Sequence, residues 1–376
     1  MIGKPDASAL LRRACTLAAA SALMLAVARP AAAADTYLPM CFKPGGPAVV
    51  KLAAKPGPFR IAFANGFVGN SWRVQMIQTL AAYAAQPEVA KHIKELHTVS
   101  VGIDVSAQIA AVDNFINAGY DAILLEASSP TAFRPVLRRA KKAGVLIVTF
   151  DNVLDNVAAD DPVIQVNEDQ VEMGRMMGRW LDSTMKEKKR VLEVRGVSGT
   201  SVDRDRHDGF RQALGDDHGM QFTEVVGNWD DGTAQKAVAD ALAVNGHFDG
   251  MYVQAGSTGA VRALLDAHQM IPVGGEDENG YRKQIAQYGK DGLLGDSAGQ
   301  SPALVAVALK AALAALEGEP IPQSVTVPIP EANYKTLKAG ETYFPELSDT
   351  FFAASNFPPC DINLTAAQIT GQAKPE

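Results

Sequence analysis

The chain has 376 residues, enough for two domains with separate cores, and 47% of its residues are hydrophobic. Its 42 acidic residues outnumber its 35 lysines and arginines, which gives a formal net charge of −7. Such an acidic chain lacks the basic surface that nucleic-acid binding requires, so no nucleic-acid partner is expected.

Residues 1–34 have the pattern of a secretory signal peptide. Lys4, Arg12 and Arg13 precede an apolar, alanine-rich stretch that ends in a run of alanines, so we expect cleavage after Ala34. A membrane anchor is the alternative, but a spanning helix needs about 20 strongly apolar residues and this stretch is shorter. Export could use the general or the twin-arginine route.

Two cysteines remain after the expected cleavage, Cys41 and Cys360, near opposite ends of the chain. Exported proteins fold in an oxidising compartment, where disulfides form and persist. We therefore expect a bridge between these cysteines, with two free thiols as the alternative.

Short apolar runs alternate with helical patterns from residue 59 to about residue 318. This alternation predicts an α/β fold with doubly wound parallel sheets covered by helices on both faces. Helices are expected over 106–119 and from starting points near Ser71, Thr131, Asp169, Ser201, Thr233, Thr258 and Ser301. The expected strands are 59–65, 96–101, 120–127, 145–152, 163–167, 190–196, 222–228, 248–255, 271–277 and 292–298.

A faint internal repeat relates the two halves of this region. YDAILLEASSPTAFRPVL at 120–137 can be laid on FDGMYVQAGSTGAVRALL at 248–265, and Asp151 then corresponds approximately to Asp277. A repeat of this length is too long for a solenoid and suits two similar α/β lobes. The alternative is that all parallel α/β units look alike.

Ligands of such sheets bind beyond the carboxyl ends of the strands, and there the sequence places polar and aromatic residues. No catalytic elbow, phosphate-binding loop, dinucleotide loop or zinc motif is present, so we expect no enzyme, cofactor or metal. The residues suit a polyol instead, because aromatic rings stack on sugar C–H faces while carboxylates, amides and guanidinium groups bind hydroxyls. The candidates are Asn70, Trp72, Arg73, Asp151, Asn152, Arg204, Trp229, Asp277 and Gln300.

Each candidate also has a structural interpretation. Trp72 and Trp229 could be core residues, and Arg204 could be a surface charge on a helix. Asp151 and Asp277 could cap helices or form turns.

Five motifs, in this order and spacing, resemble the ribose-type periplasmic sugar-binding proteins of bacterial ABC importers: GNSWR, VTFDN, GTSVDRDRHDGF, GNWDDGTAQ and GQSP. The resemblance implies a periplasmic monomer whose two lobes, joined by three crossings, close on a sugar and deliver it to an inner-membrane ABC permease. Lobe one would comprise 35–164 and 301–323, and lobe two 165–300 and 324–340. Residues 341–376 lie outside the family core and are expected to form a strap held to Cys41.

The resemblance places Asn70, Trp72, Asp151, Arg204, Trp229, Asp277 and Gln300 on the ligand-binding positions of the family. The chain departs from ribose-like members at three positions, where Arg73 replaces an aromatic residue, Asn152 an arginine and Ala255 an asparagine. Its first motif, GNSWR, is SxWR-like, and in this it is similar to galactofuranose-type members. A furanose or a substituted sugar therefore fits better than ribose, and Arg73 would bind a ligand hydroxyl or a ligand carboxylate.

Other functions remain open at this point. The same binding residues could serve a chemoreceptor or a sensor kinase. A transcription regulator of this fold is disfavoured by the signal peptide and by the missing N-terminal helix-turn-helix. A secreted enzyme would need an acid/base pair beside the sugar, for which Asp151 and Asp277 are the candidates.

Overall fold

The computed structural model describes residues 43–187, 190–215 and 219–373, together with residues 1 and 41. The expected signal peptide and its cleavage site lie outside these residues and stay predictions. No helix in the described part of the chain has the length and apolar character needed to cross a membrane.

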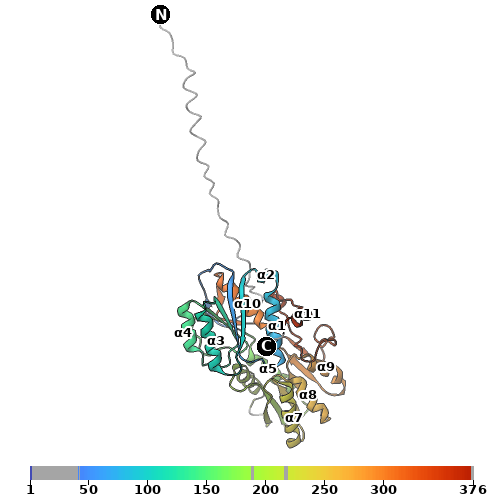
Figure 1. The fold of residues 1–376 in the computed structure, drawn as a ribbon. Coiled ribbons are helices and arrows are strands. Elements are labelled where there is room, and N and C mark those ends of the chain that lie inside the picture. Colours follow the sequence, from blue (N-terminus) through green and yellow to red (C-terminus); the bar gives the residue numbers. More distant parts are fainter. Residues whose placement is uncertain (2–40, 42, 188–189, 216–218, 374–376) are drawn as a thin grey trace. The chain divides into compact units, whose positions relative to one another are not determined.

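Two large, mostly parallel sheets form the two lobes, which confirms the expected α/β fold (Figure 1). The lobe-one sheet has the order β1 (Lys43–Pro44), β14 (Ser324–Thr326), β7 (Val163–Asn167), β6 (Leu146–Phe150), β5 (Ala122–Leu125), β3 (Phe59–Asn65) and β4 (Ile93–Ser100). The lobe-two sheet has the order β15 (Glu331–Asn333), β12 (Gly295–Ala298), β11 (Val273–Gly275), β10 (Gly250–Val253), β8 (Arg190–Arg195) and β9 (Gln221–Val226).

The ten strands expected from the sequence are β3 to β12, and all of them are confirmed, with ends shifted by a few residues at most. Central parallel strands are buried on both faces and therefore form continuous apolar runs that the sequence reveals. The strands that were not expected contain only two or three residues each, too few to leave a pattern. They are β1, β14 and β15, and the antiparallel pair β2 (Val49–Val50) and β13 (Ile321–Pro322).

Helices cover both faces of the lobe-one sheet (Figure 1). Ile61 and Phe63 of β3 pack in one cluster with α1 (Ser71–Ala84) and α10 (Leu304–Leu316). Ala62 and Ala64, which point the other way, pack with α3 (Val105–Asn117) and α4 (Arg134–Ala143). This alternation follows from the two-residue period of a strand. A short helix, α2 (Pro87–Ala90), follows α1.

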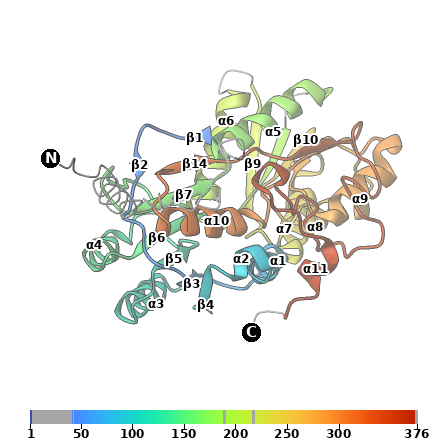
Figure 2. The ribbon, with the colours of Figure 1, turned by 90° about the horizontal axis from the view of Figure 1, so that it is seen from above.

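The lobe-two sheet is covered in the same way (Figure 2). One face carries α5 (Gln170–Thr184) and α6 (Ser201–Leu214), and the other carries α7 (Asp231–Asn245), α8 (Ser257–Asp266) and α9 (Asn279–Tyr288). Helices α5 and α6 approach so closely at Gly209 that a Cβ atom there would lie 1.9 Å from the Val171 carbonyl oxygen. Only glycine allows this contact, which fixes how far α6 stands from α5.

The internal repeat corresponds to a duplicated topology. The strand order β4-β3-β5-β6-β7 of lobe one matches β9-β8-β10-β11-β12 of lobe two. The aligned sequence segments contain β5 and β10, which are the equivalent central strands. Equivalent carboxyl ends therefore occur in both sheets, and both sets contribute to the site described below.

Three crossings join the lobes: between β7 and α5, between β12 and α10, and between β14 and β15. Strands β7 and β14 both pair within the lobe-one sheet. The boundary expected at 164/165 therefore falls inside β7, and the boundary expected at 323/324 directly precedes β14.

Residues 341–373, the described part of the C-terminal strap, pass from lobe two to lobe one. On lobe two, the Asn279 side-chain amide donates to the carbonyl oxygens of Phe344, Leu347 and Ser348. On lobe one, the strap ends in α11 (Ala366–Thr370) beside α1 (Figure 2). The strap thus adds a fourth connection between the lobes.

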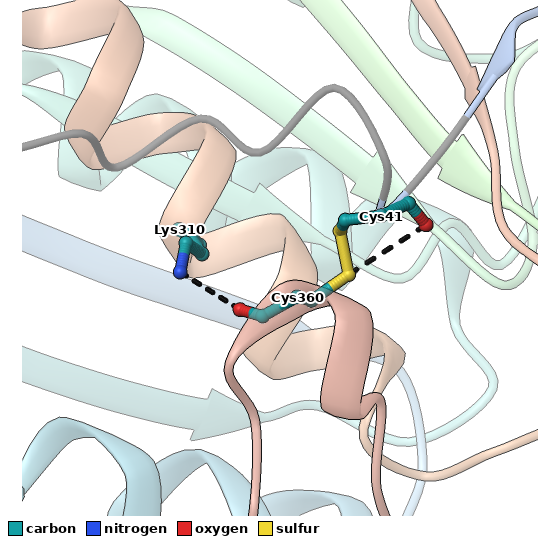
Figure 3. The surroundings of a disulfide bond; sticks show 3 residues. All are labelled: Cys41, Lys310 and Cys360. Atoms are coloured by element: carbon teal, nitrogen blue, oxygen red, sulfur yellow. Dashed lines mark hydrogen bonds between the residues drawn. A yellow bond between two sulfur atoms is a disulfide. The ribbon is translucent and has the colours of Figure 1, made fainter.

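A disulfide between Cys41 and Cys360 fastens the strap to the start of lobe one (Figure 3). Both residues are buried, and Lys310 Nζ of α10 donates to the Cys360 carbonyl oxygen at 2.7 Å. The bond joins residues 319 positions apart, so it closes nearly the whole folded chain into one loop.

Replacing both cysteines with serine should lower the free energy of unfolding, because the unfolded chain regains the freedom that the loop removes. Loop-closure theory gives about 5 kcal/mol for such a long loop, usually less in practice. Urea unfolding with and without a reductant measures the effect. The reductant should shift the midpoint of the unaltered protein and leave the double variant unchanged; equal midpoints throughout would contradict the bridge.

Candidate functional site

A cavity lies between the lobes, where the carboxyl ends of the strands in both sheets meet. We call it the inter-lobe cavity. It is lined by Asn70, Trp72, Arg73, Asp151, Val202, Arg206, Trp229, Ala255, Glu276, Gln300 and Phe352. Six of the nine candidates from the sequence are in this lining, namely Asn70, Trp72, Arg73, Asp151, Trp229 and Gln300.

The N-terminus of α1 brings the first three lining residues into place. Asn70 caps the helix by accepting from the Arg73 backbone N–H at 3.0 Å, and its amide nitrogen donates across the cleft to the Trp229 carbonyl oxygen at 3.3 Å. Trp72 Nε1 donates to the Gln300 carbonyl oxygen at 2.7 Å. The Trp72 indole is therefore fixed to the crossing between β12 and α10, and it also belongs to the lobe-one core.

Arg73 is held inside lobe one by a buried carboxylate that the sequence analysis missed. Its terminal nitrogens contact both carboxylate oxygens of Glu126, which follows β5, and one also reaches Asn65 at 3.3 Å. Burial alone would raise the pKa of Glu126, but the adjacent Arg73 charge lowers it below the usual value. The Arg73 Nε atom is buried and has no hydrogen-bond partner among the residues that the structure describes.

Asp151 lines the cavity from a residue with an unusual backbone conformation. Its φ of 58° lies in the left-handed region, which non-glycine residues rarely adopt outside turns and functional sites. Its Oδ1 atom accepts from Gln300 Nε2. Burial, followed by the neighbouring Glu126 charge, raises the pKa of Asp151 to about 8.

Asn152 does not line the inter-lobe cavity, which corrects its expected place in the site. It is buried, and its amide nitrogen donates to Glu126 and to Asp151, each at 2.7 Å. Its oxygen accepts from the Val202 backbone N–H of lobe two at 3.4 Å. Asn152 therefore positions two carboxylates and touches the opposite lobe.

The lobe-two arginine in the cavity is Arg206, not Arg204. Arg206 is buried, with Nε donating to Gln170 at 2.7 Å, Nη1 2.5 Å from Glu276 and Nη2 donating to Gln300. Arg204 is largely exposed on α6 and pairs with Asp155 of lobe one at 2.9 and 3.2 Å.

Helical periodicity distinguishes the two arginines. Val202, Arg206 and Phe210 are spaced by four residues and share the buried face of α6. Arg204 is off this face. The motif resemblance selected Arg204, whereas the spacing from the apolar residues indicates Arg206, the arginine that lines the cavity.

Trp229 reaches the cavity through two consecutive residues with left-handed backbone, Asn228 at φ 52° and Trp229 at φ 57°. Its indole lies against Gly196, where an added Cβ atom would be 2.0 Å from Nε1. The Trp229 Nε1 atom is buried without a hydrogen-bond partner. Gly196 therefore provides the space that lets a large ring occupy this position.

Asp277 does not line the cavity, and the C-terminal strap is the reason. The Asp277 carboxylate accepts from the Ala354 backbone N–H at 2.6 Å, and its backbone oxygen accepts from Ala353 at 3.0 Å. The residue before it, Glu276, lines the cavity instead. Burial raises the pKa of Glu276 to about 8, although the adjacent Arg206 charge opposes the shift.

A separate charged cluster lies outside the cavity. Within the described part of the chain, Glu193, His207 and Glu224 form the one group with metal-compatible spacing. Arg195 lies 3.2 Å from Glu224 and 3.9 Å from Glu193, so a guanidinium already balances these carboxylates. We describe the cluster as an ion-pair network of lobe two.

Comparison with known proteins identifies the family. The model of the periplasmic binding protein domain matches residues 61–320. The chain belongs to the periplasmic binding protein family. It is 30% identical to the D-ribose/D-allose-binding protein of Pseudomonas aeruginosa, over 71% of this chain and 85% of that protein. It is 28% identical to the galactofuranose-binding protein of Escherichia coli, over 44% of this chain and 51% of that protein.

Solved structures of this family share the fold. The binding component of the arabinose ABC transporter from Shewanella, bound to L-arabinofuranose, gives a TM-score of 0.65 at 21% identity, over 74% of this chain and 92% of that chain. The fructose-binding periplasmic domain of a hybrid two-component system gives a TM-score of 0.62 at 21% identity, over 73% of this chain and 90% of that chain. The resemblance to ribose-type and galactofuranose-type sugar-binding proteins is confirmed.

The free energy of unfolding of this periplasmic binding protein should fall as the pH rises from about 4 to about 8. Asp151, which faces Glu126, Arg73 and Arg206, has its pKa raised to about 8 by burial. The folded protein thus holds a proton that the unfolded chain releases near pH 4, and this preference is lost as the pH rises through 8. Asp151→Asn should flatten the decline in urea midpoints. Asp266→Asn, at an exposed carboxylate, should not; equal slopes for all three proteins would refute the assignment.

Proposed function

We propose that this protein captures a neutral sugar, most suitably a furanose, between its lobes in the periplasm and delivers it to an inner-membrane ABC permease. The observation that carries the proposal is the pair of tryptophans, Trp72 from lobe one and Trp229 from lobe two, that line one cavity together. Aromatic rings bind the apolar faces of sugars at low cost in conformational entropy.

Polar groups beside the rings suit hydroxyl groups. Carboxylates of Asp151 and Glu276 and the amides of Asn70 and Gln300 line the cavity. Such groups accept from or donate to sugar hydroxyls with defined geometry. Asp151, Glu276 and Gln300 are buried; Asp151 is hydrogen-bonded to Gln300 and Glu276 pairs with Arg206, so these three groups are held in place before a ligand arrives.

The arginines favour a neutral ligand over a sugar acid. Both terminal nitrogens of Arg73 contact Glu126, and the three nitrogens of Arg206 contact Gln170, Glu276 and Gln300. A two-pronged contact to a ligand carboxylate would require one of these arginines to leave its partners. The Nε atom of Arg73 can still donate one hydrogen bond to a hydroxyl.

A furanose is supported by the departures from ribose-like members and by the relatives. Arg73 stands where those members have an aromatic residue, and Ala255, a small residue, lines the cavity. The related galactofuranose-binding protein carries a furanose in its name. Ribose itself is the less suitable ligand.

The lobes meet at the rims of the cavity, as a ligand-capturing protein in its closed form requires. The Asn70 to Trp229 bond and the paired Arg204 and Asp155 side chains connect lobe one with lobe two. A sugar that contacts both lobes shifts the balance toward this closed form by its preference for it. The closed form is the one that we expect the permease to recognise.

The secreted sugar-cleaving enzyme considered from the sequence loses the acid/base pair that was named for it. Its acid/base pair would have been Asp151 and Asp277, but only Asp151 lines the cavity. Asp277 is turned to the backbone of the C-terminal strap. Two carboxylates that act on one glycosidic bond must both reach it.

Trp229→Ala should weaken sugar binding by about 2–4 kcal/mol, the range of aromatic hot spots, because the ring contacts the ligand from lobe two. Calorimetry against D-ribose, D-allose, L-arabinose, D-galactose and D-galactonate measures this. Trp180→Ala, on α5 and outside the lining, is the matched control. We expect a neutral sugar to bind with little salt dependence and D-galactonate not to bind.

Failure of every sugar to bind the unaltered protein would refute the sugar-binding proposal. Binding of galactonate alone, with strong salt dependence, would refute the neutral ligand while keeping the site.

A sensor role is the second candidate, favoured by the fold that the chain shares with the fructose-binding domain of a two-component system. Cells that lack the protein should lose uptake of the radiolabelled sugar, and the unaltered gene should restore it. Uptake that persists, together with a lost transcriptional or chemotactic response to the sugar, would assign the protein to a sensor.

A further inference from the structure

The C-terminal strap carries a phenylalanine into the inter-lobe cavity. Phe352 is 3% exposed and lines the cavity together with the two tryptophans. It lies outside residues 61–320, which the family domain matches. The ring therefore enters the cavity from a segment outside the matched family domain.

Backbone contacts with both lobes fix the position of Phe352. Its N–H donates to Gln75 Oε1 of α1 at 2.8 Å, and Gln75 Nε2 donates to its carbonyl oxygen at 3.0 Å. Its neighbours in the strap bind lobe two, where Ala353 donates to Asp277 and Phe351 accepts from Asn279 at 2.7 Å. Gln75 is itself buried, so the ring is held by a complete pair of hydrogen bonds in a dry environment.

Phe352 also separates the cavity from the outside. A second hollow, which opens between the N-termini of α1 and α7, is lined by residues of both lobes and by Thr350. Three residues line both spaces and form the partition between them, namely Asn70, Trp229 and Phe352. The length of a ligand in the inner cavity is limited by this partition.

The ring adds apolar surface to a lining that also contains the charged Arg73 and the small Ala255. The strap that brings in Phe352 also donates a backbone hydrogen bond to the carboxylate of Asp277, which is not in the lining. One segment thus engages this acceptor and adds a ring to the lining.

We propose that Phe352 is a ligand-contacting residue that determines specificity. Its ring packs on the C–H groups of the bound sugar and stops substituents from extending past the partition. This inference rests on the proposed sugar-binding function, and it assigns to the C-terminal strap a direct part in ligand choice.

The test compares three variants by calorimetry. Phe352→Ala removes the ring, and Phe352→Leu retains apolar volume without an aromatic face. Phe351→Ala is the matched control, because Phe351 is equally buried on the same strap, packs against Phe344 with ring centroids 6.2 Å apart and is not in the lining. Urea unfolding of each variant checks that the fold is retained.

The probes are the neutral monosaccharides named above and methyl β-D-galactofuranoside. We expect Phe352→Ala to bind the monosaccharide preferred by the unaltered protein at least about tenfold more weakly, with an intermediate loss for Phe352→Leu and under about threefold for Phe351→Ala. In Phe352→Ala, the affinity for the methyl furanoside should rise relative to the affinity for the free sugar.

The outcomes separate the two proposals. If the unaltered protein binds no sugar, the proposed function and this inference both fail. If it binds a sugar and Phe352→Ala binds the whole panel as the unaltered protein does, the inference alone is overturned. Equal losses in Phe352→Ala and Phe351→Ala would also overturn it, since they would indicate a general disturbance of the strap. Should Phe352→Ala fail to fold, Phe352→Leu decides by the same criteria.

Discussion

The side-chain amide of Gln300 connects the two lobes at the back of the cavity, and the charged groups of the site depend on it. Its nitrogen donates to Asp151 of lobe one, and its oxygen accepts from Arg206 of lobe two. Buried charges are costly unless they are paired and hydrogen-bonded. Gln300 therefore links the carboxyl groups of Glu126 and Asp151 in lobe one to Glu276 in lobe two through one polar network. It lies in the crossing between β12 and α10, about which the lobes would move.

This network limits what the cavity can accept. Its arginines are engaged with protein carboxylates and amides, so a ligand meets a surface that is already nearly satisfied. Among the described residues, Arg73 Nε and Trp229 Nε1 are buried donors of the lining without a hydrogen-bond partner, and an acceptor that reached either would relieve its desolvation cost. A preorganised site of this kind distinguishes sugars by the placement of hydroxyls more than by net charge, and the tryptophans supply apolar contact area.

The sequence predicted the central strands, and it selected six of the residues that line the inter-lobe cavity. Buried parallel strands need continuous apolar runs, such as 59–65 and 163–167, and polar residues just after them converge at one edge. Trp72, Trp229 and Gln300 were found in this way. Short edge strands and the exact crossings depend on pairing between distant segments, which no local pattern records.

Two differences between the expected residues and the observed cavity lining, at Asp277 and at Phe352, arise from interactions between residues far apart in sequence. Asp277 follows the right strand, but the C-terminal strap supplies backbone donors that turn it from the cavity, and Glu276 takes the place beside Arg206. Phe352 reaches the cavity on a strap that is held by both lobes and by the disulfide to Cys41. Arg204 differs, because its exposure follows from the helical period alone and could have been predicted. A sequence motif thus locates the binding edge of each sheet, while long-range packing decides which side chains at that edge face the ligand.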